Sequence, residues 1–504
     1  MADREQWKSQ VGFLMAAVGS AIGLGNIWRF SYMAYEYGGG AFLIPYFIAL
    51  LTAGIPLLIL EFAIGHERIG SAPLAYAKIH PKWEWLGWWA VIFVMFGIEL
   101  YYTTIISWCA NYFVFSFNIA WGDDPNTFFF GKFLNITDGP HELGGIRGPI
   151  LAGLVVVWAL NWAILYRGVQ RGVELANRIF MPLLLVLTVI LVIWAMGLEG
   201  AGAGIKAYLR PDFSKLAKAD VWIAAYSQIF FTLSLGFGIM VAYASYLPEK
   251  TNITRNAILT GVINCGYSLF AGFAVFATLG FMANVEGKAV SEVVNKSIGL
   301  AFVAYPKAIS MMPGGAIFGA VFFLCLFVAG MSSSISIMEA FASALIDKFN
   351  YSRTRVVTVI TVAGFLGSIV FATRGGLFWL DIADHFINNY GLVTVGIAEC
   401  ILVGWFFNTS MLREHVNRIS SIQLGGWWDS MVKTGIPVIL LIILGGNLFG
   451  EISKAYEGYS WRALLFIGAN WLAICLVAAL IVAIRPWKNM NHKGPSRTDL
   501  WNNE

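Results

Sequence analysis

The chain has 504 residues, of which 58% are hydrophobic and only 12% carry a charged side chain. This composition excludes a soluble globular protein and is typical of an integral membrane protein. The formal net charge is +4. Because the Lys and Arg residues lie mostly in loops, we interpret this charge as a sign of membrane topology and not of nucleic-acid binding. The five cysteines lie in apolar segments, where they behave as small hydrophobic residues, and their spacing predicts neither a disulfide framework nor a metal site.

Apolar runs long enough to cross a bilayer recur along the whole chain, which predicts an all-α protein with twelve membrane spans. An even number of spans puts both termini on one side, and the loops on that side hold more Lys and Arg, which predicts cytoplasmic termini. The polar start predicts no cleavable signal peptide, and the lack of a cysteine pair in the first long outside loop favours a bacterial inner membrane as the plasma membrane concerned. The predicted spans are 11–35, 41–65, 86–120, 150–166, 178–197, 222–245, 256–283, 313–345, 356–373, 389–409, 434–450 and 464–485.

The first span contains the most unusual stretch, AVGSAIGLGNIWRF from Ala17 to Phe30. Its glycines weaken the helix at membrane depth, where an unwound turn is tolerated only if it lines a cavity inside the protein. Free carbonyls at such a break suit a cation, and the amides that open the second half-helix suit a carboxylate. The sequence therefore predicts a broken helix and a ligand site here.

The sixth span has a similar interruption around Gly236 and Gly238, preceded by Thr232 and Ser234. Breaks in spans one and six predict two inverted five-helix repeats with the site between them. The corresponding units are residues 1–197 for spans 1–5, residues 198–410 for spans 6–10, and residues 411–504 for the last two spans and the C-terminus. Alternatively, glycines in either span only allow close helix packing.

Further polar residues lie at membrane depth. Asn264 and Ser268 are four residues apart in the seventh span and share a helix face. Ser332, Ser333 and Ser334 follow Gly330 in the eighth span. Hydroxyl and carbonyl oxygens suit a hard, singly charged cation better than zinc or copper. Taken singly, such serines often bond their own backbone or a neighbouring helix.

Buried Arg29 needs a partner near the outer end, and Asp384, predicted just before the tenth span, is well placed. On the inner side, Arg4 has a candidate partner in Asp347. Both pairs can also be ordinary interfacial ion pairs. Glu61, Glu99 and Glu399 lie within spans and are candidate functional residues, although Glu61 can simply accept hydrogen bonds from broken backbone.

The motifs GSAIGLGNIWRF, GGGAFLIPYF, ELYYTTIISW, FFTLSLGFG and AGMSSSISIM identify a resemblance to the neurotransmitter:sodium symporter family, which includes the bacterial leucine transporter. The resemblance extends from Arg4 through the tenth span. It implies a sodium-coupled symporter that imports a neutral amino acid or a close analogue by alternating access, with the lipid bilayer and a small-molecule substrate as its partners. It leaves the substrate and the oligomeric state open.

The resemblance also implies the ion and substrate ligands. The first sodium ion is expected at Ala21, Asn26, Thr232, Asn264 and the substrate carboxylate. The second is expected at Gly19, Ile22, Ala329, Ser332 and Ser333, where Ser332 replaces the threonine of the leucine transporter. The substrate is expected to contact Ala21, Leu24, Gly25, Ile98, Tyr102, Phe231, Thr232, Ser234, Phe237, Ser333 and Ile337. An outer gate is expected at Arg29 and Asp384 with Phe231 and Tyr102, and an inner gate at Arg4, Trp7, Tyr246 and Asp347.

Two positions distinguish branches of the family. Gly23 replaces the aspartate of the amine-transporting branch, which argues against an amine without a carboxylate. Ser268 replaces the glutamate or aspartate of many bacterial relatives and matches the chloride-dependent branch. The resemblance thus predicts a chloride ion at Tyr46, Gln228, Thr232 and Ser268. The alternative is that an intramembrane acid, Glu99 above all, supplies the negative charge.

Rival functions are less consistent with the sequence. An amino-acid sensor that binds without translocating is the main alternative, although we see no signalling domain at either terminus. A membrane enzyme needs a nucleophile with a base or a metal cluster, and the six histidines are scattered in or near loops. A channel needs a lined pore, whereas the polar groups here predict an enclosed pocket.

Overall fold

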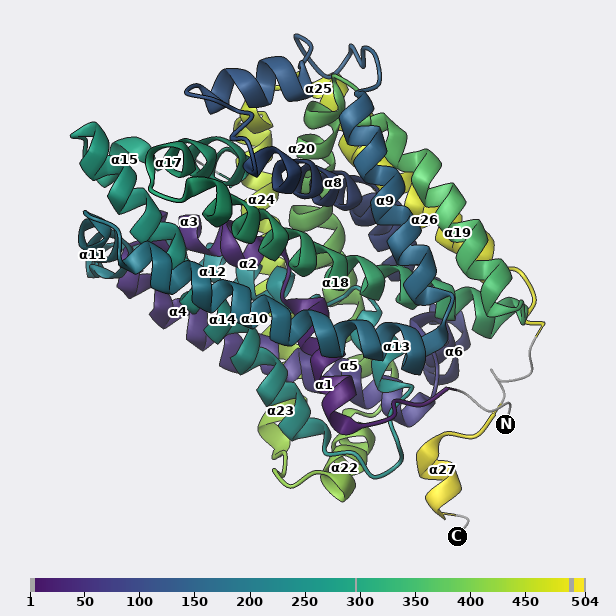
Figure 1. Cartoon of the computed structure of the whole chain (residues 1–504). Helices are drawn as coiled ribbons and strands as arrows, with labels where there is room; N and C mark the ends of the chain where they lie inside the picture. The colour runs from purple at the N-terminus through teal and green to yellow at the C-terminus, as the bar shows by residue number, and fades with distance from the viewer. Residues whose placement is uncertain (1–4, 295–296, 489–493, 503–504) are drawn as a thin grey trace.

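A computed structural model describes residues 5–294, 297–488 and 494–502. The described residues form helices and their connections, with a single isolated β-bridge between Ile146 and Thr373. Long helices run side by side through the molecule, and shorter ones cover its two ends (Figure 1). The five cysteines are all buried, in line with the apolar segments that contain them.

Ten helices are long and apolar enough to cross a membrane, and a bent pair of helices makes an eleventh candidate among the described residues. The bent pair is the predicted first span, which consists of α1 (Gln10–Ala21) and the segment Leu24–Glu36, with α2 (Leu24–Ile27) and α3 (Arg29–Glu36), at an angle of 69°. The other ten are Gly39–Arg68, Pro81–Ser116, Gly148–Leu165, Val169–Met196, Ile253–Glu286, Gly315–Phe349, Arg353–Ala372, Gly376–Phe406, Gly426–Gly458 and Trp461–Ala483.

The predicted sixth span consists of two shorter helices and is not among these eleven. It contains α12 (Ala219–Thr232) and α13 (Ile239–Ala244), separated by Leu233–Gly238. Gly236 and Gly238 have φ values of +76° and +70° in this linker, so only residues that tolerate left-handed backbone fit there. The helix breaks predicted at the glycines of spans one and six are both confirmed.

The tenth span begins earlier than the sequence suggested. Its first helix, α20, covers Gly376–Phe386, so Asp384 lies inside the span and not before it. The prediction was wrong because Asp381, Asp384 and His385 interrupt the apolar run, whereas in the fold each has a polar partner that lets the helix continue. The outside segment after the seventh span contains several short helices, including α15 (Val290–Val293) and α17 (Tyr305–Met311).

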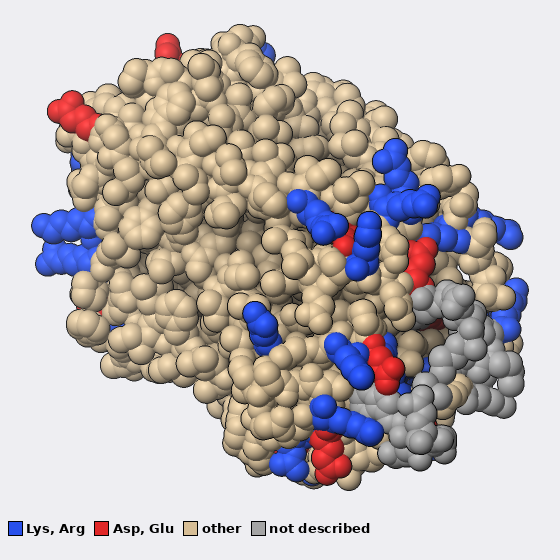
Figure 2. Space-filling model, turned by 60° about the horizontal axis from the view of Figure 1, so that its bottom comes forward, with Lys and Arg blue, Asp and Glu red and all other residues tan. Residues whose placement is uncertain are grey.

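Four helices enclose the interior that matters for function. They belong to four membrane spans, namely the two broken spans and the spans that contain α8 (Glu99–Ser116) and α18 (Gly315–Phe349). Helices α14 (Ile253–Glu286) and α10 (Leu175–Met196) pack against them from the other side. Lys and Arg side chains are prominent on the face that holds both termini, which is the bottom of Figure 1 and comes forward in Figure 2.

Candidate functional site

The break in the first span leaves backbone groups free for a ligand. Ile22 and Gly23 are extended between α1 and α2, and the Asn26 side chain caps the second half by accepting from the Gly23 amide at 2.8 Å. A Cβ atom at Gly23 would lie 2.8 Å from the Tyr102 hydroxyl and 3.1 Å from the Ser333 hydroxyl. Glycine is therefore needed so that the backbone can approach both side chains.

The break in the sixth span is stabilised by a carboxylate. The Gly236 amide donates to Glu61 at 2.8 Å, and Glu61 is almost fully buried. A buried carboxylate is an effective partner for an amide that has lost its helical acceptor. Glu61 therefore has the structural role that the sequence left open, as an acceptor for broken backbone.

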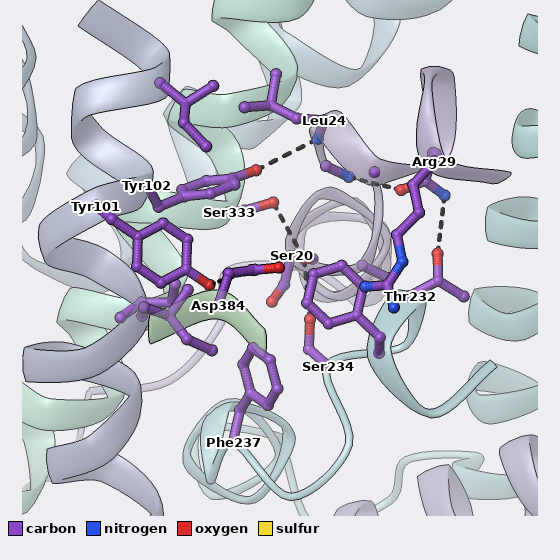
Figure 3. Close-up of a pocket in the computed structure, with 18 of the residues that line it drawn as sticks. Ser20, Leu24, Arg29, Tyr101, Tyr102, Thr232, Ser234, Phe237, Ser333 and Asp384 are labelled. Atoms are coloured by element: carbon purple, nitrogen blue, oxygen red, sulfur yellow. Dashed lines mark hydrogen bonds between the residues drawn. The ribbon is translucent and has the colours of Figure 1, made fainter. Parts of the chain in front are cut away.

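A cavity of about 110 Å³ lies between the two breaks, α8 and α18. Its floor and walls combine apolar side chains with hydroxyl and amide groups (Figure 3). All the residues predicted to contact substrate line it: Ala21, Leu24, Gly25, Ile98, Tyr102, Phe231, Thr232, Ser234, Phe237, Ser333 and Ile337. The Tyr102 hydroxyl lies 3.3 Å from the Leu24 amide, at the start of the second half-helix.

The side chains predicted for the first sodium ion lie together. The Asn26 amide group donates to the Thr232 hydroxyl at 3.1 Å, to the Asn264 side-chain oxygen at 2.8 Å and to the Ser268 hydroxyl at 2.8 Å. Three oxygens thus converge on one positively polarised group, deep in the protein. Oxygen atoms that surround a positively polarised group in this way can also surround a small cation.

The residues predicted for the second sodium ion also lie close together. The Ser333 hydroxyl lies 3.4 Å from the Ile22 carbonyl oxygen. A Cβ atom at Gly19 would come within 2.4 Å of both the Ser332 hydroxyl and the Asn177 side-chain oxygen. The cluster therefore holds backbone and hydroxyl oxygens, and no group of three or more His, Cys, Asp or Glu side chains suited to a metal occurs in the described part of the chain.

Asn177 on α10 is a member of this cluster that the sequence analysis missed. It is fully buried, and its side-chain oxygen accepts from the Ser332 hydroxyl at 2.5 Å. Its amide nitrogen in turn donates to the Val173 carbonyl at 2.9 Å, which fixes the orientation of the amide. The available signal was an asparagine directly before the predicted fifth span, but no motif linked it to the eighth span.

The residues predicted to bind chloride are all buried. Tyr46 and Gln228 are fully buried, yet the Tyr46 hydroxyl and both polar atoms of the Gln228 amide lack a hydrogen-bond partner within the described structure. Buried polar groups without a partner are rare and costly, so these atoms could accommodate a further hydrogen-bonding group. Tyr46 lies close to Ser268, and Gln228 is one helical turn from Thr232 on α12.

Glu99 lies elsewhere. One of its carboxylate oxygens accepts from the Ser334 hydroxyl, which in turn accepts from the Asn161 amide at 2.7 Å. The hydrogen bonds of Glu99 thus lead to α18 and to α9 (Gly148–Leu165), and none joins it to the Asn26 cluster. Whether Glu99 or an anion supplies the negative charge stays a prediction to be tested.

The outer end of the cavity contains the two charged residues predicted as a gate. Arg29 and Asp384 both line it, but the salt bridges among described residues do not include this pair. The Arg29 guanidinium lies 4.7 Å from the centre of the Phe231 ring, whereas Asp384 accepts from the Tyr101 hydroxyl at 2.6 Å. Tyr101, the neighbour of the predicted gate residue Tyr102, thus binds Asp384 (Figure 3).

The inner end is tightly packed. The Trp7 backbone amide donates to the Tyr246 carbonyl at 3.0 Å, and its ring nitrogen donates to the Tyr243 carbonyl at 2.8 Å. Asp347 accepts from the Ser71 amide at 2.9 Å. Arg4, the predicted partner of Asp347, lies outside the described residues. The structure therefore combines an outer pair that is apart with an inner end that is closed.

A cavity where two broken membrane helices meet, with free helix ends and hydroxyl groups in its lining, is typical of secondary transporters. Comparison with known proteins defines the class further. The family model for the sodium:neurotransmitter symporter family matches residues 4–127 and 122–492, so the chain belongs to this family.

Relatives from three organisms are similar to this chain over almost its whole length. An uncharacterized sodium-dependent transporter of Methanocaldococcus jannaschii is 47% identical over 95% of this chain and 97% of its own length. The sodium- and chloride-dependent taurine transporter of Canis lupus familiaris is 29% identical over 96% and 84%, and the sodium-dependent dopamine transporter of Caenorhabditis elegans is 28% identical over 99% and 89%. The relatives are transporters, and the chain is accordingly a membrane transporter and not an enzyme.

Proposed function

We propose that the protein is a sodium- and chloride-dependent symporter that imports a small neutral amino acid through the cavity between the two helix breaks. The observation that carries the proposal is a cavity lined by free helix ends, with two clusters of oxygen atoms and a set of unpaired buried polar groups on the helices packed around it. Each feature alone has an ordinary structural explanation, but together they match the ligand set of a coupled transporter.

The helix ends suit the two charges of an amino acid. The Leu24 and Gly25 amides at the start of α2, with the Tyr102 hydroxyl, suit the carboxylate, because a helix N-terminus carries positive polarity. The last carbonyls of α12, at Phe231 and Thr232, suit the ammonium group together with the Ala21 carbonyl and the Ser234 hydroxyl. Arg29 and Asp384 are the only charged residues that line the described cavity and lie towards its outer end, so a zwitterion fits its centre.

Two sodium ions are cargo in this proposal. The first binds at Ala21, Asn26, Thr232 and Asn264, and the second at Gly19, Ile22, Ala329, Ser332 and Ser333. A buried carboxylate without a counter-charge is strongly unfavourable, so a sodium ion beside it binds cooperatively with the substrate. That cooperativity is the basis of coupling.

Chloride is proposed at Tyr46, Gln228, Thr232 and Ser268, where it would supply a negative charge near the first sodium ion. The unpaired Tyr46 hydroxyl and Gln228 amide are donors of the kind that an anion needs. Ser268 leaves this position without a fixed carboxylate. The taurine relatives are named as chloride-dependent, in line with this proposal.

The architecture proposed for transport has twelve spans, with α12 and α13 together forming the sixth. Spans 1–5 and 6–10 would form the two inverted repeats, and the last two spans a separate unit. The Lys and Arg residues on the face with both termini support a cytoplasmic position for that face (Figure 2). The cavity would open outwards, close when Arg29 meets Asp384, and then open inwards as the contacts of Trp7 and Asp347 release.

The test is uptake of a radiolabelled mixture of neutral amino acids into proteoliposomes, with external sodium and chloride replaced separately. We expect uptake to be lost without sodium and strongly reduced without chloride. Replacing Ser268 by glutamate should restore uptake in chloride-free buffer, because the variant carries its own negative charge. Uptake that is indifferent to chloride in the wild type would rule out the anion site but leave sodium coupling in place.

A further inference from the structure

One hydroxyl group at the cavity has no role in the sites described above. Ser20 lies in the last turn of α1, lines the cavity and is only 2% exposed. Its hydroxyl group makes no hydrogen bond to any described residue. Serine in a helix commonly bonds the carbonyl of the preceding turn, so a buried serine that does not is unusual.

The two neighbouring serines differ from Ser20 in this respect. The Ser234 hydroxyl donates to the Ser20 carbonyl at 3.2 Å, and the Ser333 hydroxyl lies 3.3 Å from the same oxygen. Figure 3 shows Ser20 between these two residues, where both helix breaks and α18 meet. Their protons are engaged by the backbone, whereas the donor and the acceptor of Ser20 are both available to a ligand.

The size of the cavity limits what that ligand can be. At about 110 Å³ it is smaller than an apolar cavity of about 150 Å³ that accommodates benzene. A molecule with a backbone and one to three further heavy atoms therefore suits this cavity better than one with an aromatic side chain. Ile98, Ile337 and Phe237 supply apolar walls for a methyl group beside the hydroxyl site.

We propose that Ser20 determines substrate specificity and selects small amino acids with a side-chain hydroxyl group, the class of serine and threonine. A hydroxyl group offers one donor and two acceptor lone pairs, which matches the available donor and acceptor of Ser20. A site with an unpaired buried polar group disfavours an analogue that leaves it unpaired. This inference rests on the proposed function, because it concerns the same cavity.

The experiment compares initial sodium-driven uptake of threonine and valine into proteoliposomes, with serine and alanine as a second pair. Threonine and valine have nearly the same shape, so their ratio of kcat/KM isolates the hydroxyl group. We expect wild-type protein to favour threonine by about fivefold, as one neutral hydrogen bond provides. Ser20→Ala and Ser20→Cys should bring the ratio close to one, whereas Ser20→Thr, which keeps the hydroxyl, should retain the preference.

Ser31→Ala is the matched control. Ser31 is a buried serine of the same span, but its hydroxyl bonds the Ile27 carbonyl at 2.7 Å and it does not line the cavity, so the ratio should not change. A wild-type ratio of one or less, or a preference that persists in both Ser20→Ala and Ser20→Cys, would overturn the inference while sodium-driven uptake upholds the proposed function. Absence of sodium-driven uptake for all four amino acids would instead count against the proposed function itself.

Discussion

At the scale of single residues, the cluster predicted for the second sodium ion depends on the direction of the Ser332 hydroxyl proton. Ser332 donates its hydroxyl proton to Asn177, so its lone pairs are left to face Gly19 and the break in the first span. The second hydrogen bond of Asn177, to Val173, prevents the amide from turning. In the sodium site that we propose, Asn177 is therefore a positioning residue for the hydroxyl ligand Ser332, comparable to the outer partners that orient ligands at metal sites.

Replacing Asn177 by alanine should weaken sodium binding without removing substrate contacts. We expect the sodium concentration for half-maximal uptake to rise about three- to tenfold, which corresponds to the loss of one hydrogen bond. Sodium titrations of uptake in proteoliposomes measure this directly. Ser332→Ala should have a similar effect, and the double variant should be little worse than either single one, because both remove the same contact.

Thr188→Val provides the control on the same helix. Thr188 is buried on α10 and bonds the Leu184 carbonyl and the Tyr267 hydroxyl, away from the cluster. The sodium dependence of uptake by the Thr188→Val variant should match that of the wild type. Fully additive effects of the Asn177 and Ser332 variants would show that the two side chains act independently and would contradict this account.

The same residues show what the sequence can and cannot predict. Asn26, Thr232 and Asn264 were predictable because each belongs to a motif beside a glycine break or shares a face with another polar residue. Asn177 was not, since it lies just before the predicted fifth span, belongs to no recognised motif, and has its partner 155 residues away in the chain. Tyr101 was missed for a related reason, because side-chain orientation decided whether it or Tyr102 meets Asp384.

At the scale of elements, the start of the first span is fastened to the fifth. Glu174 is almost fully buried, accepts from the Lys8 amide at 2.8 Å and lies 3.2 Å from the Ser9 hydroxyl, which caps α1. Gly12 makes this contact possible, since a Cβ atom there would lie 2.0 Å from the Glu174 carboxylate. The inner half of the first span therefore moves only if this contact breaks.

Gly12→Ala should release the N-terminal segment although alanine favours helix by about 1 kcal/mol. The new methyl group displaces the carboxylate and removes its bonds to Lys8 and Ser9. Hydrogen–deuterium exchange followed by mass spectrometry should show faster exchange across residues 7–12. Gly266→Ala, in α14 with no atom within 4 Å of the added methyl group, should leave that exchange unchanged. Slow exchange in Gly12→Ala would mean that Glu174 does not hold the segment.

Helix boundaries were harder to predict than the breaks themselves. Glycines in apolar spans indicated both breaks, because the local backbone preference and the tertiary structure agree there. The start of the tenth span was misplaced because its acidic residues are paired by Tyr101, Tyr456 and Tyr459 from other elements. Local hydrophobicity cannot reveal such partners.

At the scale of the whole molecule, the two ends of the cavity are in different states. The inner end is closed by Trp7 and its contacts with the sixth span, while Arg29 and Asp384 at the outer end are bonded to other groups. In the alternating-access cycle that we propose, this combination corresponds to the outward-facing state. The family was predictable from motifs, whereas the conformation was not, because both states use the same sequence.

Sodium coupling sets how far such a cycle can concentrate its substrate. A tenfold sodium gradient supplies about 1.4 kcal/mol per ion, and a potential of 100 mV adds about 2.3 kcal/mol per charge. With two sodium ions and no membrane potential, the gradient alone supports an accumulation of about 100-fold.

The central claim is that the sodium gradient drives the substrate uphill. Its most direct test is the steady-state ratio of internal to external threonine in proteoliposomes with a tenfold inward sodium gradient, equal chloride on both sides and the membrane potential clamped at zero. The account predicts a ratio well above one, approaching about 100 for two ions, that falls to one when an ionophore removes the sodium gradient. The same ratio is measured for the other neutral amino acids tested. If these amino acids bind in a sodium-dependent way but none reaches an internal-to-external ratio above one, the claim is contradicted and the protein is a sensor on a transporter scaffold.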